Sequence, residues 1–481
     1  MSARSSVETI KEEARDIKVI READIVVVGG GPGGVGSAIA AARTGADTVL
    51  IERYGHLGGM ATGGLVNILP NLSDISGKQH IYGLNQEIID RMEKRNAAFY
   101  PDKKDWGTTD KKLVDFYNDT GLNLFYVRKD PNLGGQERVM YTAVVDPEVL
   151  KDELNDMVQE AGVDLLLHSW GTRPIMEGDT VRGVYFESKS GRQAILAKVV
   201  IDSTGDGDIF VEAGAEFDPE LNNKRRTAWL AFTFWLTDVN IKKADDFKKS
   251  QPEKYAELMQ ELLKLGGYPH YLKGILGNQR NVLWYHSFQI QPESSDGKDV
   301  RVLTRVDIRG RKRALITYEF MKKNVPGFEN CYIMQTAPQL GTQGGRRVIG
   351  EYILDDKDMI SDEVHEDTIV VLANNDNGEI SAKHPSICIP YRCLVPKRVD
   401  GLLVACRAFS STDSVNQYFN IIPPCIAYGQ AAGTAAALAV DAGGQPRKVD
   451  YKKLHDSLVK QGVNLPGVKS KKAGSSKAQV A

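Results

Sequence analysis

The 481-residue chain has few cysteines and no long apolar run. Its five cysteines are odd in number and none has Cys-x-x-Cys spacing, which argues against a disulfide framework, a zinc site, a dithiol redox pair and an iron–sulfur cluster. We therefore expect no bound metal. No apolar stretch approaches the roughly 18 residues of a bilayer-spanning helix. The N-terminal segment is charged throughout and has neither the apolar centre of a signal peptide nor a twin arginine, so we expect a cytoplasmic protein without a membrane partner.

The charge of the chain is nearly balanced. A formal net charge of −2 gives no general attraction to nucleic acid or to an anionic membrane. Hydrophobic residues make up 42% of the chain and charged residues 26%, which is typical of a soluble globular enzyme. A chain of 481 residues exceeds the usual size of a single core, so two lobes are predicted.

A glycine-rich turn follows the first strand-like run. Residues 24–28 are Asp-Ile-Val-Val-Val, a composition typical of a buried parallel strand. Next comes Gly-Gly-Gly-Pro-Gly-Gly, in which Gly29, Gly31 and Gly34 occupy the positions of Gly-x-Gly-x-x-Gly. In a dinucleotide-binding unit the first glycine permits a tight turn, the second lets the backbone approach a pyrophosphate, and the third lets helix and strand pack closely. The segment that follows, up to Arg43, predicts a helix whose N-terminal amides face the pyrophosphate.

An acidic residue ends the second predicted strand, residues 48–51. Glu52 follows Gly34 by 18 residues, close to the roughly 20 expected for a ribose-binding acid. Its carboxylate would accept hydrogen bonds from ribose hydroxyls and repel a 2′-phosphate, which favours FAD or NAD over NADP. Strand, glycines, helix, strand and acid thus follow the order of a dinucleotide-binding βαβ unit.

A second glycine cluster, at positions 58, 59, 63 and 64, favours FAD over NAD. A plain dehydrogenase has no need of it, whereas the ribityl and isoalloxazine parts of FAD run past this loop. Four later segments extend the pattern: a strand ending in Thr-Gly, an arginine-rich segment, a last strand and a closing helix (199–208, 344–352, 401–407 and 423–433). On these motifs, most of the chain resembles the FAD-dependent oxidoreductases of the glutathione-reductase-like superfamily. It more closely resembles the branch related to the flavoproteins of succinate dehydrogenase and fumarate reductase.

The resemblance implies an α/β fold with a Rossmann-like FAD-binding domain, in three layers with a parallel sheet plus a β-meander, and an inserted α+β substrate domain. Both domains are expected to be discontinuous in sequence. The expected division is an N-terminal arm with helical periodicity (1–22), the FAD-binding domain (23–65, 141–214 and 396–445), the substrate or cap domain (66–140 and 215–395), a C-terminal extension (446–467) and a disordered tail (468–481).

Periodicity and composition predict individual elements within this division. The predicted helices are 83–95, 147–162, 241–265 and 429–440, and the predicted meander strands are 164–168, 180–187 and 194–202. Asp146 before Pro147 is expected to cap the helix that begins there. The closing helix, preceded by a Pro-Pro turn, is expected to begin at Gly429 and to direct its N-terminus at the N1–C2=O edge of the flavin.

The motifs and the resemblance together give a set of expected FAD contacts. These are Gly29, Gly31, Pro32, Gly34, Glu52, Arg53, His56, Gly58, Gly59, Met60, Thr62, Val145, Thr204, Gly205, Asp206, Arg407, Asn420, Gly429, Gln430 and Ala432. In the succinate dehydrogenase relatives a histidine near the position of His56 bonds covalently to the flavin. The register differs here, so non-covalent FAD is expected, and a covalent link through His56 is the less favoured alternative.

Hydride transfer at flavin N5 also needs a group that handles the substrate proton and donors that hold a carboxylate or carbonyl. His384 and His286 are candidates for the acid or base, each with a purely structural role as the alternative. Arg346 is a candidate clamp for a substrate carboxylate, and its alternative is a salt bridge to Glu351 or Asp355.

Tyr418 lies just before the closing helix and is the fourth candidate catalytic residue, because it is expected to line the flavin face with Asn420. The alternative for this segment is turn chemistry, in which asparagine is common.

The chain also lacks a second strand–glycine–helix unit for a nicotinamide nucleotide and any haem-attachment motif. Electrons are therefore expected to pass directly between flavin N5 and a small organic substrate, with an external electron acceptor or donor. The predicted function is FAD-dependent hydride transfer, as C–H dehydrogenation or C=C reduction, by a homo-oligomer. An FAD-dependent isomerase or hydratase, and a flavoprotein subunit of an electron-transfer complex, are the alternatives.

Overall fold

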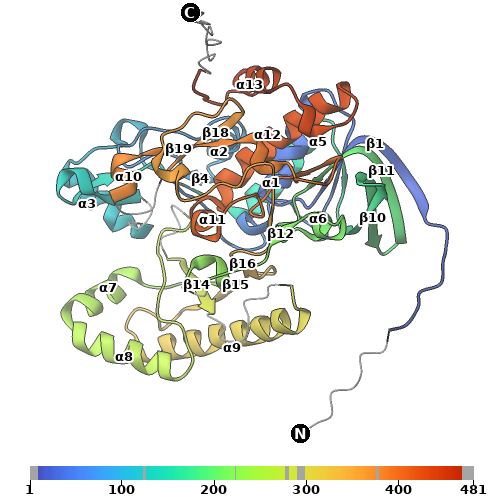
Figure 1. Cartoon of the computed structure of the whole chain (residues 1–481). Coiled ribbons are helices and arrows are strands. Elements are labelled where there is room, and N and C mark those ends of the chain that lie inside the picture. Colours follow the sequence, from blue (N-terminus) through green and yellow to red (C-terminus); the bar gives the residue numbers. More distant parts are fainter. Residues whose placement is uncertain are drawn as a thin grey trace, which may run out of the picture.

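The computed structural model describes residues 9–122, 126–222, 224–276, 281–289, 298–374 and 379–467. The predicted tail, 468–481, and the first eight residues of the predicted arm lie outside these ranges. Figure 1 shows a larger body, which contains the main sheet, and a second, largely helical lobe below it. No helix within the described ranges combines the length and the apolar content needed to cross a bilayer.

The main sheet is built on parallel strands that run through the centre of the body. β8 (Asp164–Leu166), β2 (Thr48–Ile51), β1 (Lys18–Val28) and β11 (Gly191–Asp202) are neighbours in that order, and β20 (Leu402–Val404) also pairs with the end of β11. Alternate residues of β1 enter two different hydrophobic cores, which explains why its sequence is apolar without a break. The strands predicted at 24–28 and 48–51 are confirmed.

Two predictions, one about the N-terminal arm and one about the meander, need correction. The arm (1–22) was expected to be helical, but residues 9–17 have no regular structure, and the next residues belong to β1, where Lys18 pairs with Gln193. The meander consists of β9 (Trp170–Glu177), β10 (Thr180–Ser188) and β11, in which β10 pairs antiparallel with both β9 and β11. β9 was not predicted, because glycine and proline interrupt its apolar pattern. The strand predicted at 164–168 is instead β8, a parallel edge strand beside β2.

Small residues bring two helices unusually close on one face of the sheet. α1 (Pro32–Arg43) packs along α12 (Ile422–Asp441), and a Cβ added at Gly429 would lie 2.1 Å from the carbonyl oxygen of Gly33. α5 (Pro147–Glu160), α2 (Leu84–Lys94) and α13 (Tyr451–Lys460) complete this face. The prediction for α5 is confirmed in detail: Asp146 caps it by accepting hydrogen bonds from the amides of Glu148 and Val149.

The closing helix begins earlier than predicted. α12 starts at Ile422, so Pro423 and Pro424 lie in its first turn instead of forming a turn before it. Proline is compatible with this position, because the amides of the first turn have no partner within the helix. Consequently Gly429 lies in the interior of the helix and not at its N-terminus.

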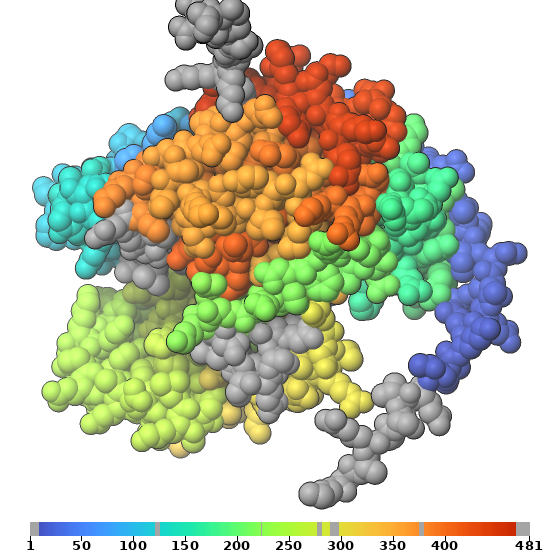
Figure 2. Space-filling view, viewed as in Figure 1, coloured from blue at the N-terminus to red at the C-terminus, as the bar shows by residue number. Residues whose placement is uncertain are grey.

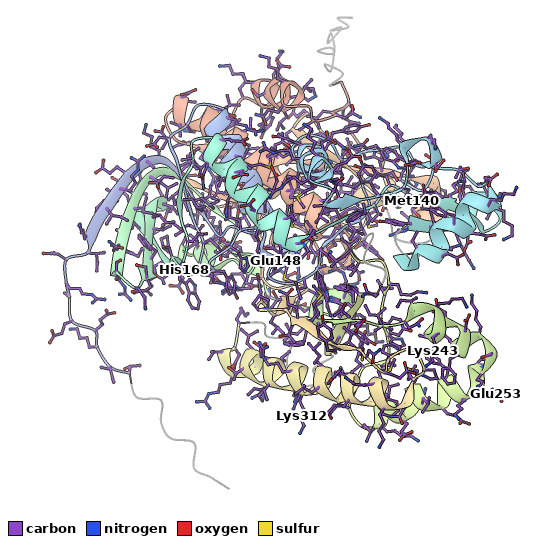
Figure 3. All side chains as sticks on the ribbon, turned by 180° about the vertical axis from the view of Figure 1, so that it is seen from behind. Met140, Glu148, His168, Lys243, Glu253 and Lys312 are labelled. Carbon is purple, nitrogen blue, oxygen red and sulfur yellow. The ribbon has the colours of Figure 1, made fainter. Side chains whose placement is uncertain are left out.

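The second lobe is an antiparallel sheet covered by helices. Its strands are β13 (Leu230–Thr237), β14 (Leu283–Gln289), β15 (Tyr332–Thr336) and β16 (Gly341–Thr342), and its helices are α7 (Ile241–Ser250), α8 (Pro252–Lys264) and α9 (Val300–Asn324). Phe232, Phe234 and Tyr285 are fully buried in a core that belongs to this lobe alone. Seen from behind in Figure 3, the labelled residues Lys243, Glu253 and Lys312 lie on α7, α8 and α9. In Figure 2 the yellow-green part of this lobe forms one lower corner of the surface.

Not all of the predicted substrate domain belongs to this lobe. The remaining elements are β3 (Ile68–Leu69), β4 (Ala98–Phe99), β5 (Val127–Asp130), β6 (Gln136–Val139), β7 (Ala143–Val145), β12 (Phe217–Asp218), β17 (Arg347–Val348), β18 (Thr368–Ala373), β19 (Ser386–Pro390), α3 (Lys111–Tyr117), α6 (Asp208–Glu212), α10 (Glu379–Lys383) and α11 (Asp413–Phe419). Side chains of α2, β18 and β19 pack into the same core as α1 and α12. The division drawn from the sequence is therefore too coarse within 66–140 and 345–395.

Candidate functional site

A cavity of about 540 Å³ lies where the carboxyl ends of the parallel strands meet the second lobe. Residues directly after β1, β2, β11 and β20 line one side of it, and residues of β14 line the other. Ligands of open α/β sheets bind at the carboxyl ends of the strands. This volume is in the range of small-molecule and cofactor pockets.

The glycine turn forms one end of the cavity. Gly29 has a φ of +98°, and a Cβ there would lie 2.6 Å from the carbonyl oxygen of Ser203. A Cβ on Gly34 would lie 1.7 Å from the carbonyl oxygen of Gly29, so this position requires glycine for close packing. A Cβ on Gly31 would meet no atom within 4 Å, and no side chain caps α1 there. The turn therefore presents open backbone and the free amides of a helix N-terminus to the cavity.

Glu52 is built into the same turn. Its side chain is buried, one oxygen accepts a hydrogen bond from the amide of Gly30 at 2.6 Å, and the other accepts one from the amide of Tyr54 at 2.7 Å. A carboxylate has about four acceptor positions, so both oxygens keep capacity for ribose hydroxyls. Beside it, the guanidinium of Arg53 lies between the rings of Tyr54 and Trp170, 4.9 and 5.6 Å from their centroids. Trp170 lines the cavity and was not predicted.

An acidic and basic cluster follows the Thr204-Gly205 turn. Arg407 donates to a carboxylate oxygen of Asp206 at 2.7 Å, and Arg346 donates to a carboxylate oxygen of Asp208 at 2.9 Å. Burial and the neighbouring carboxylates raise the pKa of Asp208 to about 6. Arg346 does not line the cavity; its salt bridge is formed with Asp208 and not with either of the two acids expected from the sequence.

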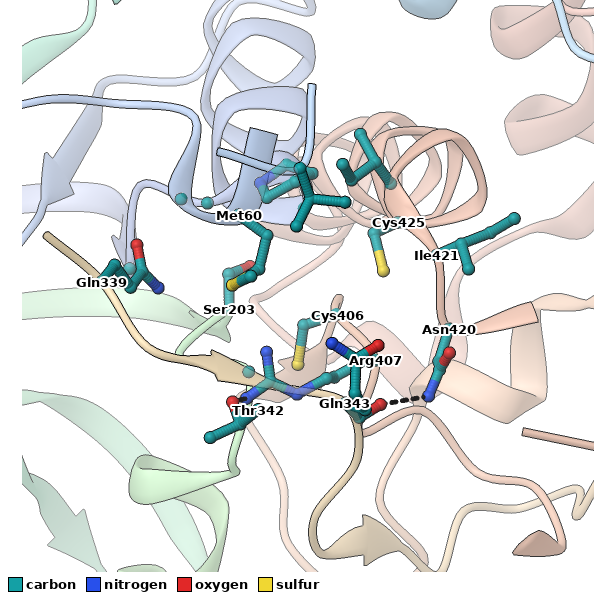
Figure 4. A pocket seen from close by; sticks show the side chains of 18 of the residues that line it. Met60, Ser203, Gln339, Thr342, Gln343, Cys406, Arg407, Asn420, Ile421 and Cys425 are labelled. Carbon is teal, nitrogen blue, oxygen red and sulfur yellow. Dashed lines mark hydrogen bonds between the residues drawn. The ribbon is translucent and has the colours of Figure 1, made fainter. Parts of the chain in front are cut away.

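Two buried polar atoms at the cavity lack hydrogen-bond partners among the described residues. They are Nε of Arg407 and Oε1 of Gln339. Figure 4 shows both side chains at the cavity with Met60, Cys406 and Cys425. A buried polar group without a partner is costly, so a ligand with donors and acceptors is expected here. With the open turn at Gly31, these atoms show that the residues present fit an FAD molecule.

The first turn of α12 also faces the cavity. Ile421 precedes the helix without a side-chain cap, and Ile422 and Cys425 line the cavity. The predicted approach of the helix N-terminus is thus made by residues 421–425. Gly429 packs on α1, and Gln430 accepts a hydrogen bond from the amide of Leu84 at 3.0 Å, so neither lines the cavity.

His286 lies on the aromatic wall that the second lobe contributes. It is directly opposite Thr233 in the β13–β14 pair, and Nδ1 lies 2.8 Å from the hydroxyl of Thr233. Its ring stacks on Trp284 with the planes 5° apart and meets Phe288 edge to face. Burial lowers the pKa of His286 to about 3, with Arg226 as a second cause. The imidazole is therefore neutral at pH 7.

A relay of hydrogen bonds favours one tautomer of this histidine. Arg226 donates to Oε1 of Gln343 at 2.8 Å, which directs the amide NH₂ of Gln343 toward Nε2 of His286 at 3.5 Å. Nε2 is then the acceptor, and Nδ1–H donates to Thr233. Arg226 also donates to Asn420, whose own amide donates to the carbonyl of Gln343 at 2.8 Å (Figure 4). Arg226 lines the cavity and was missed from the sequence, since nothing near it signals its partners.

The structure thus sorts the predicted residues into two groups. Those that line the cavity are Gly29, Gly31, Pro32, Glu52, Arg53, Gly59, Met60, Thr204, Gly205, Arg407, Asn420, His286 and Tyr418. Those that do not are Gly34, His56, Gly58, Thr62, Val145, Asp206, Gly429, Gln430, Ala432, Arg346 and His384.

The two remaining histidine predictions differ in their surroundings. His384 pairs with Asp362 at 2.8 Å near the surface, away from the cavity. His56 stacks on Tyr54 with the rings 4° apart and lies 3.4 Å from the hydroxyl of Thr62. Burial lowers the pKa of His56. It lies behind the glycine loop and does not line the cavity.

Comparisons with known proteins identify the family of the chain. The family described as FAD dependent oxidoreductase matches residues 24–458. Digeranylgeranylglycerophospholipid reductases of Methanocella arvoryzae and Methanoculleus marisnigri are 25% and 27% identical over 221 residues, or 46% and 45% of this chain. The match spans about half of these relatives, 48% and 46% of their lengths.

Solved structures with a similar course of the chain include a geranylgeranyl bacteriochlorophyll reductase-like protein from Thermoplasma acidophilum. It is 14% identical with a TM-score of 0.44, and the match covers 92% of this chain and 84% of the other. A p-nitrophenol 4-monooxygenase from Pseudomonas putida is 12% identical with a TM-score of 0.42, with coverages of 92% and 84%.

Proposed function

Because the chain belongs to the FAD-dependent oxidoreductase family and its cofactor is FAD, we propose that it transfers a hydride between FAD and an organic molecule held against the second lobe. One observation carries the proposal: a single cavity is lined both by the turn from Gly29 to Glu52 and by the aromatic residues of β14. A cofactor seated in the turn and a molecule seated on the aromatic wall would therefore share one space.

The residues that would hold FAD follow from the geometry. Gly31 and the amides at the start of α1 suit the pyrophosphate, and Glu52 suits the ribose hydroxyls. Arg407 and the first turn of α12 supply the donors and the positive helix end. When bound, FAD would supply the group that accepts a hydride from a carbon atom of the organic molecule or donates one to it.

The residues of the second lobe would bind the organic molecule and exclude water. Trp284 stacks on His286, Phe288 meets His286 edge to face, and Tyr271 lines the same cavity. Both ring nitrogens of His286 already have partners, Thr233 at Nδ1 and Gln343 at Nε2, so the ring would contact the substrate through its face or edge. Since its pKa is about 3, it is not an imidazolium at pH 7, and its role would be to orient the substrate and not to donate a proton. Tyr418 lines the cavity and keeps only the role predicted from the sequence, whereas His384 lies away from the cavity and is not proposed as the acid or base.

The direction of the reaction is proposed to be reduction, because the two curated relatives are named as reductases. The relation to the succinate dehydrogenase and fumarate reductase branch rests on the sequence motifs and is proposed on that basis. A homo-oligomer, a cytoplasmic location and an external electron donor likewise stay predictions, as does the assignment of the second lobe as the substrate domain.

Anaerobic spectroscopy tests this proposal. Holoenzyme reduced with dithionite is mixed with a panel of unsaturated carbonyl compounds and carboxylic acids, and the visible flavin absorbance is followed. The proposal predicts that one class restores the oxidised spectrum with formation of an equal amount of saturated product. The same panel is also mixed with oxidised holoenzyme without dithionite. If a substrate is converted there while the flavin absorbance stays unchanged, the protein is an isomerase or hydratase instead.

The electron-transfer alternative is separated by a second comparison. The isolated chain, without any added protein, should reduce its substrate at a rate that accounts for steady-state turnover. If only a second protein, and no organic molecule, reoxidises the flavin, the proposal of direct hydride transfer is wrong.

A further inference from the structure

Arg226 lines the cavity and differs from Arg225, Arg346, Arg347 and Arg407 in having no carboxylate partner among the described residues. Its neighbours in sequence or space each pair with an acid: Arg225 with Asp413, Arg346 with Asp208, Arg347 with Asp218 and Arg407 with Asp206. No Asp or Glu oxygen among the described residues lies within 4 Å of the Arg226 guanidinium. Charges placed away from water are normally paired, so an unpaired cation at a cavity points to an absent anion.

Neutral oxygens hold the guanidinium of Arg226 in place. One terminal nitrogen donates to Oε1 of Gln343 at 2.8 Å, and the other donates to the carbonyl of Gln417 at 2.5 Å and to Oδ1 of Asn420. A guanidinium has five N–H donors. Nε–H and one terminal N–H therefore keep no partner within the described part of the chain. The group is fixed in position and retains donors for a ligand.

The electrostatics of this position support the same conclusion. Burial lowers the pKa of Arg226 to about 10, and the nearby guanidinium of Arg407 contributes in the same direction. The side chain is still charged at pH 7, so the cavity contains a cation that its surroundings penalise. An anion bound beside Arg226 would relieve this penalty.

The surroundings define what kind of molecule carries the anion. Trp284, His286 and Phe288 present aromatic faces and edges in the same cavity, and Leu272 adds an apolar contact. The single positive charge of Arg226 matches a single negative charge, whereas a phosphate monoester carries about −1.5 to −2 at pH 7. The planar donor group also matches the planar carboxylate.

We propose that Arg226 binds the carboxylate of the substrate, and that the substrate is an organic acid with an apolar or aromatic body. This inference rests on the proposed function, because it names the substrate class of the same cavity. Gln343 and Asn420 are positioning residues that hold the guanidinium, and His286 contacts the body of the substrate. Arg346, the candidate clamp suggested by the sequence, is already paired with Asp208.

Ligand binding to the oxidised holoenzyme tests the inference without turnover. Benzoate, benzamide and phenyl phosphate are titrated separately, and the shift of the visible flavin absorbance reports binding. The wild type should bind benzoate about 10- to 100-fold more tightly than benzamide, the range of one charge-assisted hydrogen-bonded contact. Phenyl phosphate should bind more weakly than benzoate. Equal binding of benzoate and benzamide, or tighter binding of phenyl phosphate, overturns the inference.

Variants locate the effect at Arg226. Arg226→Gln should reduce the benzoate-to-benzamide preference to less than about twofold, and Arg226→Lys should restore part of it. Arg309→Gln, which removes a cation from the exposed face of α9, is the charge control and should keep the full preference. If Arg226→Gln keeps the preference but lowers the midpoint potential of the flavin, Arg226 serves the reduced cofactor and the inference fails.

The wild-type preference decides the question even if Arg226→Gln does not retain FAD. The proposed function fails separately, in the reduction experiment, if no organic molecule exchanges electrons with the flavin. Selective benzoate binding in a protein that performs no hydride transfer would leave a carboxylate site and remove the enzyme assignment.

Discussion

The variants Gly31→Ala and Gly429→Ala test two different reasons for having glycine: access of the cofactor to the backbone, and close packing of two helices. Gly31→Ala adds a methyl group that meets no atom within 4 Å, at a backbone with φ −71° and ψ −173° that any residue adopts. Gly429→Ala adds a methyl group 2.1 Å from the carbonyl oxygen of Gly33 and 2.9 Å from the amide nitrogen of Ser37. The first methyl faces the cavity and the second lies between α1 and α12.

The sizes of the two effects follow from these distances. A carbon and a carbonyl oxygen normally approach to about 3.3–3.6 Å, so α12 has to move by more than 1 Å to accept the methyl of Gly429→Ala. Overpacking of this kind costs about 1–3 kcal/mol, or roughly a 5- to 150-fold change in the folded-to-unfolded ratio. Gly31→Ala should instead leave the apoprotein as stable as the wild type or up to about 1 kcal/mol more stable, because the unfolded chain loses freedom. Its FAD affinity should fall at least about tenfold, since the methyl occupies the space of the pyrophosphate.

Two measurements on each variant check this reasoning. Urea unfolding of the apoprotein, followed by circular dichroism, gives the midpoint, and quenching of tryptophan fluorescence gives the FAD dissociation constant. Gly31→Ala should weaken FAD binding without lowering the midpoint, and Gly429→Ala should lower the midpoint. Wild-type FAD affinity in Gly31→Ala would refute the placement of the pyrophosphate at this turn. An unchanged midpoint in Gly429→Ala would refute the close contact of the two helices.

Three further predictions concern ionisable residues at or near the cavity. Glu52→Gln should weaken FAD binding about 10- to 100-fold and destabilise the apoprotein by about 1–3 kcal/mol, because the Gln NH₂ leaves one buried backbone amide without an acceptor. Equilibrium dialysis measures the FAD affinity, and urea unfolding measures the stability of the apoprotein. Asp208→Asn should remove a pH-dependent step near pH 6 in the visible spectrum of the bound flavin, and a step that persists in the variant counts against Asp208 as its source. The pKa of His286 is about 3 in the fold and about 6.5 in the unfolded chain, so the stability that this residue contributes is present above pH 6.5 and is lost as pH falls toward 3. His286→Gln should flatten this loss of stability and reduce turnover about tenfold, whereas His384→Gln should change neither. Equal effects of the two variants would contradict the role proposed for His286.

The features that depend on residues close together in the chain were the ones best predicted from the sequence. The strand at 24–28, the turn around Gly29 and Gly31, and the acid at Glu52 depend on neighbours close in the chain, and the structure brings them to one end of the cavity. Their conformations follow from steric rules that act over a few residues, such as the need for glycine at a positive φ.

Predictions failed where distant segments decide the outcome. An arginine-rich segment drew attention to Arg346, but its partner Asp208 lies far away in sequence and becomes a neighbour only in the fold. Arg226 stands in an unremarkable polar stretch, and its role comes from Gln343 and Asn420, which are brought to it by the second lobe and by the start of α12. Such pairings leave no periodic signal in the sequence.

The start of α12 illustrates a different limit. Pro423 and Pro424 were interpreted as a turn because proline ends helices from within, yet the same residues fit the first turn of a helix. In the fold, Ile421 and Ile422 line the cavity, and the helix begins there, before the two prolines. The missing meander strand, β9, is similar, since its glycine and proline are tolerated only through its pairing with β10.

A crystal structure of the holoenzyme with benzoate tests the central claim most directly. The account predicts that the FAD pyrophosphate lies at Gly31, that the isoalloxazine ring lies between the first turn of α12 and the wall of Trp284 and Phe288, and that the benzoate carboxylate contacts Arg226. An isoalloxazine ring outside this cavity, or a cavity too filled by the ring to admit any organic molecule on the aromatic wall, would contradict it.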